Sequence, residues 1–321
     1  MSFQELIKNV RRGRPRAIAR AISLVEEGNA PARELLKGLF ACRSDAVVLG
    51  VTGAPGTGKS TLADQMIAQL RQAGWKIGVV AIDPSSPFTG GAILGDRIRM
   101  MRHSVDAGVF IRSMATRGHL GGLAKATGEA VAIYEAAGKD YVIIETVGVG
   151  QDEVDVVKLA DLVLVVLTPG SGDDIQAFKA GIMEIADIFV INKADAPGVE
   201  KMAQQLEAML EMGLPGREPP PVVKTIATTG DGVKALMAET ARLLRSRPAS
   251  FQEARRKRLL GWMLRDITRE SLLDLITRRI PETEFNRFVN RIYCRKTDPY
   301  SAADRLLAAL KKELRAKDRP K

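Results

Sequence analysis

Cysteine, histidine and aromatic residues are scarce in this 321-residue chain, which has two cysteines, two histidines and 5% aromatic residues. Cys42 and Cys294 lie far apart and form no Cys-x-x-Cys pair, so the sequence predicts neither a disulfide scaffold nor a zinc site. This cysteine usage fits a reducing, cytoplasmic setting. His103 and His119 have no third metal ligand near them, and we interpret each as a capping or packing residue.

Long hydrophobic runs are also missing. No apolar stretch approaches the ~20 residues that a membrane-spanning helix needs, and the N-terminus lacks the apolar core of a signal peptide. We therefore expect no membrane association. The net charge of +10 is compatible with a nucleic-acid partner, but stretches such as EARRKRLLGWMLRDITRE are typical of solvated helical faces. Because the chain has neither a base-reading motif nor an aromatic platform, we predict no nucleic-acid partner.

The chain instead alternates short β-branched runs with helical patterns. This alternation predicts an α/β fold with a doubly wound, mostly parallel sheet whose strands are buried on both faces. Strands are expected at 46–53, 76–83, 108–114, 141–148, 162–170, 188–195 and 222–227, with helices at 59–74, 122–138, 173–186, 199–210 and 232–246. Residues 4–42 and the chain after Pro248 have helical patterns only. We therefore predict a helical N-terminal segment over 1–43, a sheet domain over 44–247 and a helical C-terminal arm over 248–321.

A phosphate-binding loop stands between the first strand and the first helix of this sheet domain. The sequence GAPGTGKST matches the pattern G-x-x-x-x-G-K-[ST], which requires a strand before it and a helix after it. Its glycines let backbone N–H groups surround phosphates, Lys59 reaches the β- and γ-phosphates, and Ser60 offers a hydroxyl to Mg²⁺. The predicted nucleotide-binding residues of this loop are Gly53, Ala54, Pro55, Gly56, Thr57, Gly58, Lys59, Ser60 and Thr61. The fold is therefore expected to be that of a P-loop NTPase.

The motif INKAD, at the end of a later strand, predicts that the base is guanine. The carboxylate of Asp195 can accept from both N1–H and the exocyclic amine of guanine, whereas adenine has an acceptor at N1. The stem of Lys193 can lie along the base, and Asn192 can tie this loop to the phosphate loop. The backbone N–H groups of three residues at the end of the last strand are expected to face the guanine oxygen: Ile226, Ala227 and Thr228. We therefore predict a GTPase domain that binds GTP and GDP.

Carboxylates at strand ends predict a Mg²⁺ site beside the phosphates. IIETVGVG has Glu145 where related enzymes carry aspartate, and Gly148 can donate its N–H to the γ-phosphate. Asp83 and Asp96 bracket the loop DPSSPFTGGAILGD. Asp83, at the end of the second strand, faces the same crevice as Ser60 and Glu145, and Asp96 can return to it if the loop folds back over the phosphates. Asp83 can otherwise be a turn former, and Asp96 a helix N-cap. The residues expected to carry catalysis are Lys59, Asp83, Asp96, Glu145 and Gly148.

Val149 follows Gly148, where small GTPases carry the glutamine that orients the attacking water. Gln151 stands at the wrong offset to replace it. Slow intrinsic turnover is therefore expected. Four arginines in the loop regions can stabilise developing charge or can be ordinary surface residues: Arg97, Arg99, Arg102 and Arg117.

Together these motifs resemble the ArgK/MeaB family of P-loop GTPases, over roughly residues 1–300. The resemblance is carried by GAPGTGKST, DPSSPFTGGAILGDRIRM, TRGHLGGLAKAT, ETVGVGQDEVD and GDDIQAFKAGIMEIADIFVINKAD. Members of that family are chaperones of adenosylcobalamin-dependent acyl-CoA mutases, above all methylmalonyl-CoA mutase. The resemblance implies that GTP hydrolysis gates cofactor loading and protects or reactivates the mutase, with cobalamin bound only through that partner. It also implies a homodimer built by the two helical extensions.

The same resemblance implies a third switch loop over 170–179 that contacts the mutase, in which Asp174, Gln176 and Lys179 stand at the matching positions. An alternative function is a metallochaperone GTPase that delivers a metal such as nickel, although that function calls for a Cys-x-x-Cys-like or His-rich site. A signal-recognition-type GTPase is less compatible, because its helical targeting domain is longer and rich in methionine. The identity of the mutase cannot be read from the sequence.

Overall fold

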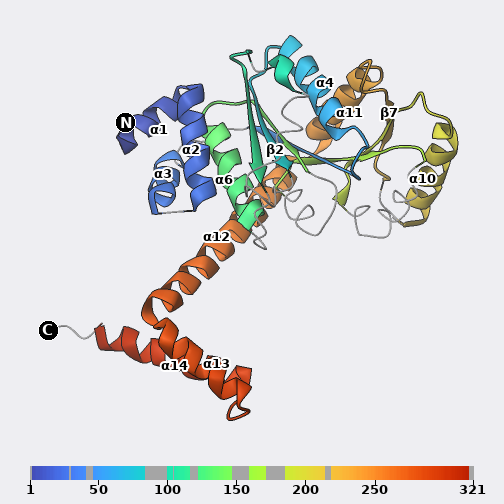
Figure 1. Cartoon of the computed structure of the whole chain (residues 1–321). Helices are drawn as coiled ribbons and strands as arrows, with labels where there is room; N and C mark the ends of the chain where they lie inside the picture. Colours follow the sequence, from blue (N-terminus) through green and yellow to red (C-terminus); the bar gives the residue numbers. More distant parts are fainter. Residues whose placement is uncertain are drawn as a thin grey trace. The chain divides into compact units, whose positions relative to one another are not determined.

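A computed structural model describes residues 2–28, 30–40, 46–83, 100–103, 105–115, 122–146, 159–170, 185–213 and 218–317. The chain divides into two compact units, Met1–Leu259 and Leu260–Lys321 (Figure 1). The predicted helix over 173–186 lies almost entirely outside the described residues. The predicted three-part division, with boundaries at 43 and 247, stays a prediction.

A seven-stranded sheet in the order β3-β2-β4-β1-β5-β6-β7 forms the centre of the first unit (Figure 1). Every strand pair is parallel. The strands are β1 (Val47–Thr52), β2 (Ile77–Asp83), β3 (Val109–Ala115), β4 (Tyr141–Glu145), β5 (Leu162–Leu167), β6 (Ile188–Asn192) and β7 (Val222–Thr225). All seven fall within one residue of the predicted runs or inside them, so the predicted doubly wound α/β fold is confirmed. Several predicted runs extended past the strand because they included motif residues of the following loop, such as Thr168 to Gly170 after β5 and Lys193 to Asp195 after β6.

Helices cover the two faces of this sheet. On one face α4 (Lys59–Gln72) packs against β1, β2 and β4, and α11 (Val233–Ser246) packs against α4 and β7. On the other face α6 (Gly122–Ala136) packs against β2, and the ring of Tyr134 lies over Gly78 so closely that a Cβ there would come within 2.6 Å of it. Helix α10 (Val199–Gly213) follows β6 in the chain. Strands covered in this way need apolar side chains on both faces, which explains why most residues of the central strands are apolar.

The N-terminal residues form three short helices, α1 (Phe3–Arg11), α2 (Pro15–Glu27) and α3 (Ala30–Phe40). The continuous pattern over 4–42 is therefore interrupted: Gly13 and Gly28 have φ angles of 67° and 65°, which end a helix. All three helices contact α6, and an ion pair between Arg112 of β3 and Glu26 of α2 ties them to the sheet. The helices thus form part of the first compact unit.

The second unit is entirely helical in its described residues, as the sequence predicted. It consists of the C-terminal part of α12 (Ala249–Arg279), followed by α13 (Glu282–Tyr293) and α14 (Pro299–Lys317). Prolines stand at both breaks between these helices, at residues 281 and 299. Ile280 and Ala302 are buried in this unit, and α13 contacts α14. No helix among the described residues is long and apolar enough to cross a bilayer.

Aspartates close the amino ends of neighbouring strands in the sheet. Asp140, Asp161 and Asp187 each stand directly before a strand. Each carboxylate accepts a hydrogen bond from a backbone N–H at the start of an adjacent strand. The donors are Lys76 for Asp140 (2.7 Å), Val48 for Asp161 (2.8 Å) and Val163 for Asp187 (2.8 Å). Arg247 in turn donates to the carbonyl oxygen of Asp161 and pairs with Asp187. These contacts satisfy the backbone N–H groups of Lys76, Val48 and Val163 at the amino edge of the sheet.

Lys139 lies at this amino edge and provides a test of the packing. Its ammonium group donates to the carbonyl oxygen of Gly108 at 2.9 Å, and burial lowers its pKa from 10.5 to about 8. Below pH 8 Lys139 is protonated in both the folded and the unfolded chain. The folded chain is then destabilised by the full free-energy cost of burying the charged ammonium group. Between pH 8 and 10.5 the unfolded chain binds more protons, so the folded state gains stability as the pH rises.

We therefore expect the wild-type chain to gain about 2 kcal/mol of stability over Lys139→Met between pH 7.5 and 9.5. Thermal melting of both chains across this pH range measures the difference. Lys201→Met, which removes an exposed lysine of α10, is the matched control and should show a difference that varies little with pH. A pH-independent gap between wild type and Lys139→Met would contradict the assignment.

Candidate functional site

The predicted phosphate loop connects the end of β1 to the start of α4, at the carboxyl edge of the sheet. Three of its glycines have φ angles that side chains rarely adopt: 144° at Gly53, 80° at Gly56 and 90° at Gly58. A Cβ on Gly53 would also lie 2.1 Å from the carbonyl oxygen of Val166 in β5. The loop therefore depends on glycine both for its backbone conformation and for its close approach to the neighbouring strand.

Lys59 and Thr57 both bond to the carbonyl groups of this loop. The buried ammonium group of Lys59 donates to the carbonyl oxygens of Gly53 at 2.8 Å and Ala54 at 3.0 Å. The hydroxyl of Thr57 donates to Ala54 at 2.9 Å. Pro55 and Gly56 form the exposed tip, and Thr61 is half-buried. The positive charge of Lys59 is therefore held at the loop, in the position expected of a phosphate-binding lysine.

Ser60 and Glu145 meet beside the loop, as the sequence predicted for two metal-binding residues. The hydroxyl of Ser60 donates to Oε1 of Glu145 at 2.5 Å, and both side chains are buried. A hydroxyl and a carboxylate are hard oxygen ligands of the kind that Mg²⁺ prefers, so this pair fits the predicted ion. Asp83 follows on the neighbouring strand: Ala81 is in register with Glu145, and Asp83 ends β2 two residues later at the same edge of the sheet.

Asn192, at the end of β6, links the phosphate loop to the loop after β7. Its Nδ2 donates to the carbonyl oxygen of Thr57 at 2.8 Å, and its Oδ1 accepts from the backbone N–H of Ala227 at 3.0 Å and from the hydroxyl of Thr225 at 3.2 Å. A Cβ on Gly58 would come within 2.4 Å of Nδ2. The expected tie between the loop of Asn192 and the phosphate loop is present in the bond to Thr57, and the bonds to Thr225 and Ala227 are contacts that the sequence did not reveal.

The residues after Asn192 form a tight loop over β7. Lys193 has a φ angle of 56°, the left-handed region that few residues other than glycine adopt, and the N–H of Ala194 donates to the carbonyl oxygen of Thr225 at 3.0 Å. Lys193 and Asp195 are both exposed. The strained lysine and the backbone bond hold the exposed carboxylate of Asp195 beside the end of β7.

Only part of the predicted guanine-oxygen contact agrees with the structure. The N–H of Ile226 donates to the carbonyl oxygen of Asp231 at 2.9 Å, and the N–H of Ala227 bonds Asn192. The N–H of Thr228 makes no hydrogen bond within the part of the chain that the structure describes. Ile226 and Ala227 are therefore both wrong as free donors in this conformation: the turn that Gly230 and Gly232 form uses the N–H of Ile226, and Asn192 uses that of Ala227.

Arg102 stands in the short helix η1 (Met101–His103) and forms an ion pair with Asp64 of α4. His103, beside it, is buried against the same aspartate, which agrees with a packing role. The described residues contain no group of three or more His, Cys, Asp or Glu that can hold a metal ion. The following predicted site residues lie outside the described residues: Asp96, Arg97, Arg99, Arg117, His119, Gly148, Val149, Gln151, Asp174, Gln176 and Lys179.

Comparisons with known proteins agree with this arrangement. The sequence profile of a family described as "Methylmalonyl Co-A mutase-associated GTPase MeaB" matches residues 18–280. A Pyrococcus abyssi protein assigned as a GTPase is 48% identical over 311 residues, covering 95% of this chain and 96% of that protein. The mouse protein named methylmalonic aciduria type A homolog, mitochondrial, is 32% identical over 322 residues, covering 94% of this chain and 77% of that protein. The crystal structure of a LAO/AO transport system kinase superposes with a TM-score of 0.67 at 26% identity, covering 96% of this chain and 97% of that one.

Proposed function

The chain belongs to the family of methylmalonyl-CoA mutase-associated GTPases that includes MeaB, and we propose that it uses GTP hydrolysis to gate cofactor loading on an adenosylcobalamin-dependent acyl-CoA mutase. The relatives are named GTPases, and the chain is a P-loop GTPase. The structural observation that carries the proposal is the position of Asn192 between Thr57 and Ala227, which joins the phosphate loop to the proposed base-binding loop. In this proposal Asp195 reads guanine, and the backbone N–H of Thr228 faces the guanine oxygen.

In the proposed mechanism, Lys59 binds the β- and γ-phosphates after exchanging its bonds to Gly53 and Ala54 for bonds to phosphate oxygens. Ser60, Asp83, Asp96 and Glu145 hold Mg²⁺, and Gly148 donates its N–H to the γ-phosphate. A Mg²⁺ ion held by these residues would supply positive charge that offsets the charge developing on the phosphate oxygens during phosphoryl transfer. The Ser60–Glu145 pair supports this assignment, since its two oxygens already lie together beside the loop.

A partner is expected to complete the catalytic site. Val149 occupies the position of the usual water-orienting glutamine, so the chain has no group there that can align the nucleophile. We propose that the mutase contacts the segment with Asp174, Gln176 and Lys179 and thereby raises the rate of hydrolysis. The chain would also protect or reactivate the mutase, and cobalamin would be bound only through that partner. The family description and the mouse relative's name support a mutase of the methylmalonyl-CoA type.

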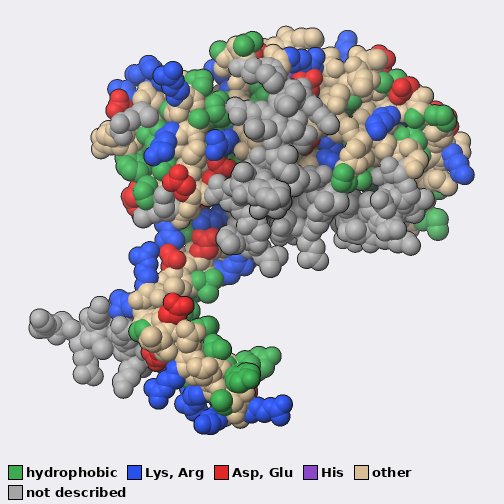
Figure 2. Space-filling model, in the orientation of Figure 1, with side chains coloured by type: hydrophobic (Ala, Val, Ile, Leu, Met, Phe, Trp, Pro, Cys, Tyr) green, Lys and Arg blue, Asp and Glu red, His purple; other side chains and the backbone are tan. Residues whose placement is uncertain are grey.

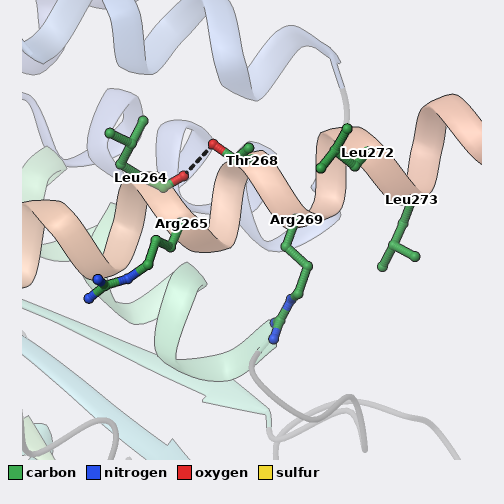
Figure 3. A pocket seen from close by; sticks show the side chains of 6 residues that line it. All are labelled: Leu264, Arg265, Thr268, Arg269, Leu272 and Leu273. Carbon is green, nitrogen blue, oxygen red and sulfur yellow. Dashed lines mark hydrogen bonds between the residues drawn. The ribbon is translucent and has the colours of Figure 1, made fainter. Parts of the chain in front are cut away.

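We further propose that the chain is a homodimer and that its C-terminal helices contribute to the interface. The second unit exposes large apolar side chains on all three of its helices (Figure 2), namely Leu264, Leu272, Leu273, Phe285, Val289, Tyr293, Tyr300 and Leu307. An open hollow of about 500 Å³ lies along α12. Two rows of side chains line it, each with a residue at every fourth position (Figure 3): one row is Leu264, Thr268 and Leu272, and the other is Arg265, Arg269 and Leu273. Monomeric proteins rarely expose so much apolar surface, which supports an interface here. Sedimentation velocity of the purified chain measures the oligomeric state directly.

Turnover of GTP with and without a mutase tests the proposed function. The purified chain is expected to hydrolyse GTP slowly alone and about ten-fold faster with adenosylcobalamin-dependent methylmalonyl-CoA mutase from the same source, which equals ~1.4 kcal/mol of barrier lowering. ATP in place of GTP, and heat-denatured mutase in place of the native enzyme, are the controls. Hydrolysis without stimulation would contradict this partner and leave the GTPase assignment in place.

A further inference from the structure

Two buried threonines meet where the phosphate loop begins. Thr52 is the last residue of β1 and stands directly before Gly53, and Thr146 directly follows Glu145, the last residue of β4. The hydroxyl of Thr146 donates to Oγ1 of Thr52 at 2.9 Å. Both residues are buried, with 1% of Thr146 and 2% of Thr52 exposed. The proposed mechanism uses neither hydroxyl, although each threonine is next to a residue of the proposed site.

The threonine pair extends the contact between β1 and β4 beyond the end of their ladder. The last residues in register are Val51 and Glu145, and the backbone N–H of Thr146 then donates to the carbonyl oxygen of Val51 at 3.1 Å. The hydroxyl bond joins the two chains one step further, at Thr52. Because a buried hydroxyl that loses its partner is costly, this bond strongly favours one relative position of the two chain segments.

The threonine pair and the Ser60–Glu145 pair lie on opposite faces of the sheet. Glu145 points toward α4, since its carboxylate accepts from Ser60 of that helix, and Val51 lies in the same core cluster as the buried residues of α4. Successive side chains of a strand point to opposite faces, so Thr52 and its partner Thr146 point away from α4. The backbone of Glu145 is therefore fixed from the face opposite to its carboxylate.

The two threonines belong to the chain segments that carry the oxygen atoms of the proposed metal site. Thr52 is also in register with Val165 of β5, so β1 ends between two neighbouring strands. The phosphate loop starts at the next residue, Gly53, and leads to Ser60 in the first turn of α4, whereas Glu145 is carried by the end of β4. The relative position of these segments sets the distance from the Ser60 hydroxyl to the Glu145 carboxylate, and the threonine pair is a side-chain link between them.

We propose that Thr52 and Thr146 are positioning residues that fix the end of β4 against the start of the phosphate loop, so that the carboxylate of Glu145 is held beside Ser60 for Mg²⁺. The inference rests on the proposed function, since it assumes that metal site. Both hydroxyls act through the backbone, from the face of the sheet opposite to the ion. Loss of the pair weakens the hold on Glu145 at the metal and leaves guanine recognition by Asp195 unchanged.

Binding of a fluorescent, non-hydrolysable GTP analogue, measured as a function of Mg²⁺ concentration, tests the inference. Thr146→Val keeps a branched side chain and removes the hydroxyl. It is expected to raise the Mg²⁺ concentration for half-maximal binding by about ten-fold, at the lower end of the range typical for groups that orient metal ligands. Thr146→Ser keeps the hydroxyl and should remain within about two-fold of wild type.

The double variant Thr52→Val/Thr146→Val separates positioning from stability. Thr146→Val leaves the hydroxyl of Thr52 buried without this donor, so it should also lower the melting temperature. The double variant removes both hydroxyls and should recover part of that loss. It should nevertheless show the same shift in Mg²⁺ requirement as Thr146→Val. A Mg²⁺ requirement that returns to the wild-type value together with the melting temperature would contradict a positioning role.

Thr240→Val is the matched control, because Thr240 is a buried threonine of α11 whose hydroxyl donates to the carbonyl oxygen of Leu236 at 2.8 Å. It should lower the melting temperature and leave the Mg²⁺ requirement within about two-fold of wild type. Equal shifts in Thr240→Val and Thr146→Val, or no shift in Thr146→Val, would overturn the inference. Ser60→Ala identifies the level of failure: if Ser60→Ala also leaves the Mg²⁺ requirement unchanged, the proposed metal site is wrong.

Discussion

Replacing Asp195 with asparagine is expected to turn a guanine-selective site into one that prefers xanthine nucleotides. Guanine presents donors at N1 and at its exocyclic amine, and a carboxylate accepts from both, whereas an asparagine amide offers one acceptor and one donor. The donor then faces a donor, and the mismatch is expected to weaken GTP binding by about 10³-fold. Xanthine carries an oxygen where guanine has its amine, so the new amide finds a matching acceptor.

Calorimetric titration with GDP and XDP measures this change in preference. Because Asp195 is exposed, the variant should keep the wild-type melting temperature. Glu200→Gln is the matched control: it removes a carboxylate in the first turn of α10, where Glu200 pairs with Lys224, and should leave nucleotide preference unchanged. If Asp195→Asn still prefers GDP, then another group reads the base.

The second large effect is expected at Lys59. Lys59→Met keeps the aliphatic stem and removes the ammonium group, which the proposed mechanism needs for charge that grows on the phosphate oxygens. Loss of one such stabilising group in a dehydrated site typically reduces turnover by about 10²- to 10³-fold. The carbonyl oxygens of Gly53 and Ala54 also lose a donor, so a smaller loss of stability accompanies the change.

Lys59→Met is expected to reduce both the rate of hydrolysis and the stability of the chain. Single-turnover measurement of GTP hydrolysis separates the two effects, because the amount of bound nucleotide is measured independently of the rate. Lys234→Met is the matched control, since Lys234 also stands in the first turn of a helix whose N-cap is a left-handed glycine, Gly232. That variant should hydrolyse GTP at the wild-type rate. Wild-type turnover in Lys59→Met would remove this lysine from the mechanism.

Much of this architecture could be predicted because its signals are local. Parallel strands covered on both faces need continuous apolar runs, and the seven runs in the sequence correspond to the seven strands. The phosphate loop was recognisable because Gly53 and Gly58 stand where a Cβ atom would clash with a neighbouring residue, so that no other residue type fits. Ser60 and Glu145 lie together because the loop after β1 and the end of β4 are at the same edge of the sheet, and their role as metal ligands stays a prediction.

What escaped prediction depends on contacts between distant residues. Arg102 looked like a loop arginine because nothing in the sequence around Asp64 reveals that the two residues meet. Ile226 was predicted to donate to a guanine oxygen, but the turn through Gly230 and Gly232 directs its N–H to Asp231. The helical pattern over 4–42 likewise gave no sign of three helices, because apolar spacing continues across the breaks at Gly13 and Gly28.

The link made by Asn192 has a consequence for how tightly fragments of the nucleotide bind. Because Asn192 bonds Thr57 on one side and Ala227 on the other, the two halves of the proposed site are already joined before any ligand arrives. Guanosine and pyrophosphate, offered separately, each lose their own translational freedom, whereas the intact nucleotide loses it once. Once one half of the nucleotide is bound, the joined loops would therefore hold the other half at a high local concentration beside its own part of the site. The intact nucleotide is expected to bind much more tightly than guanosine and pyrophosphate do separately.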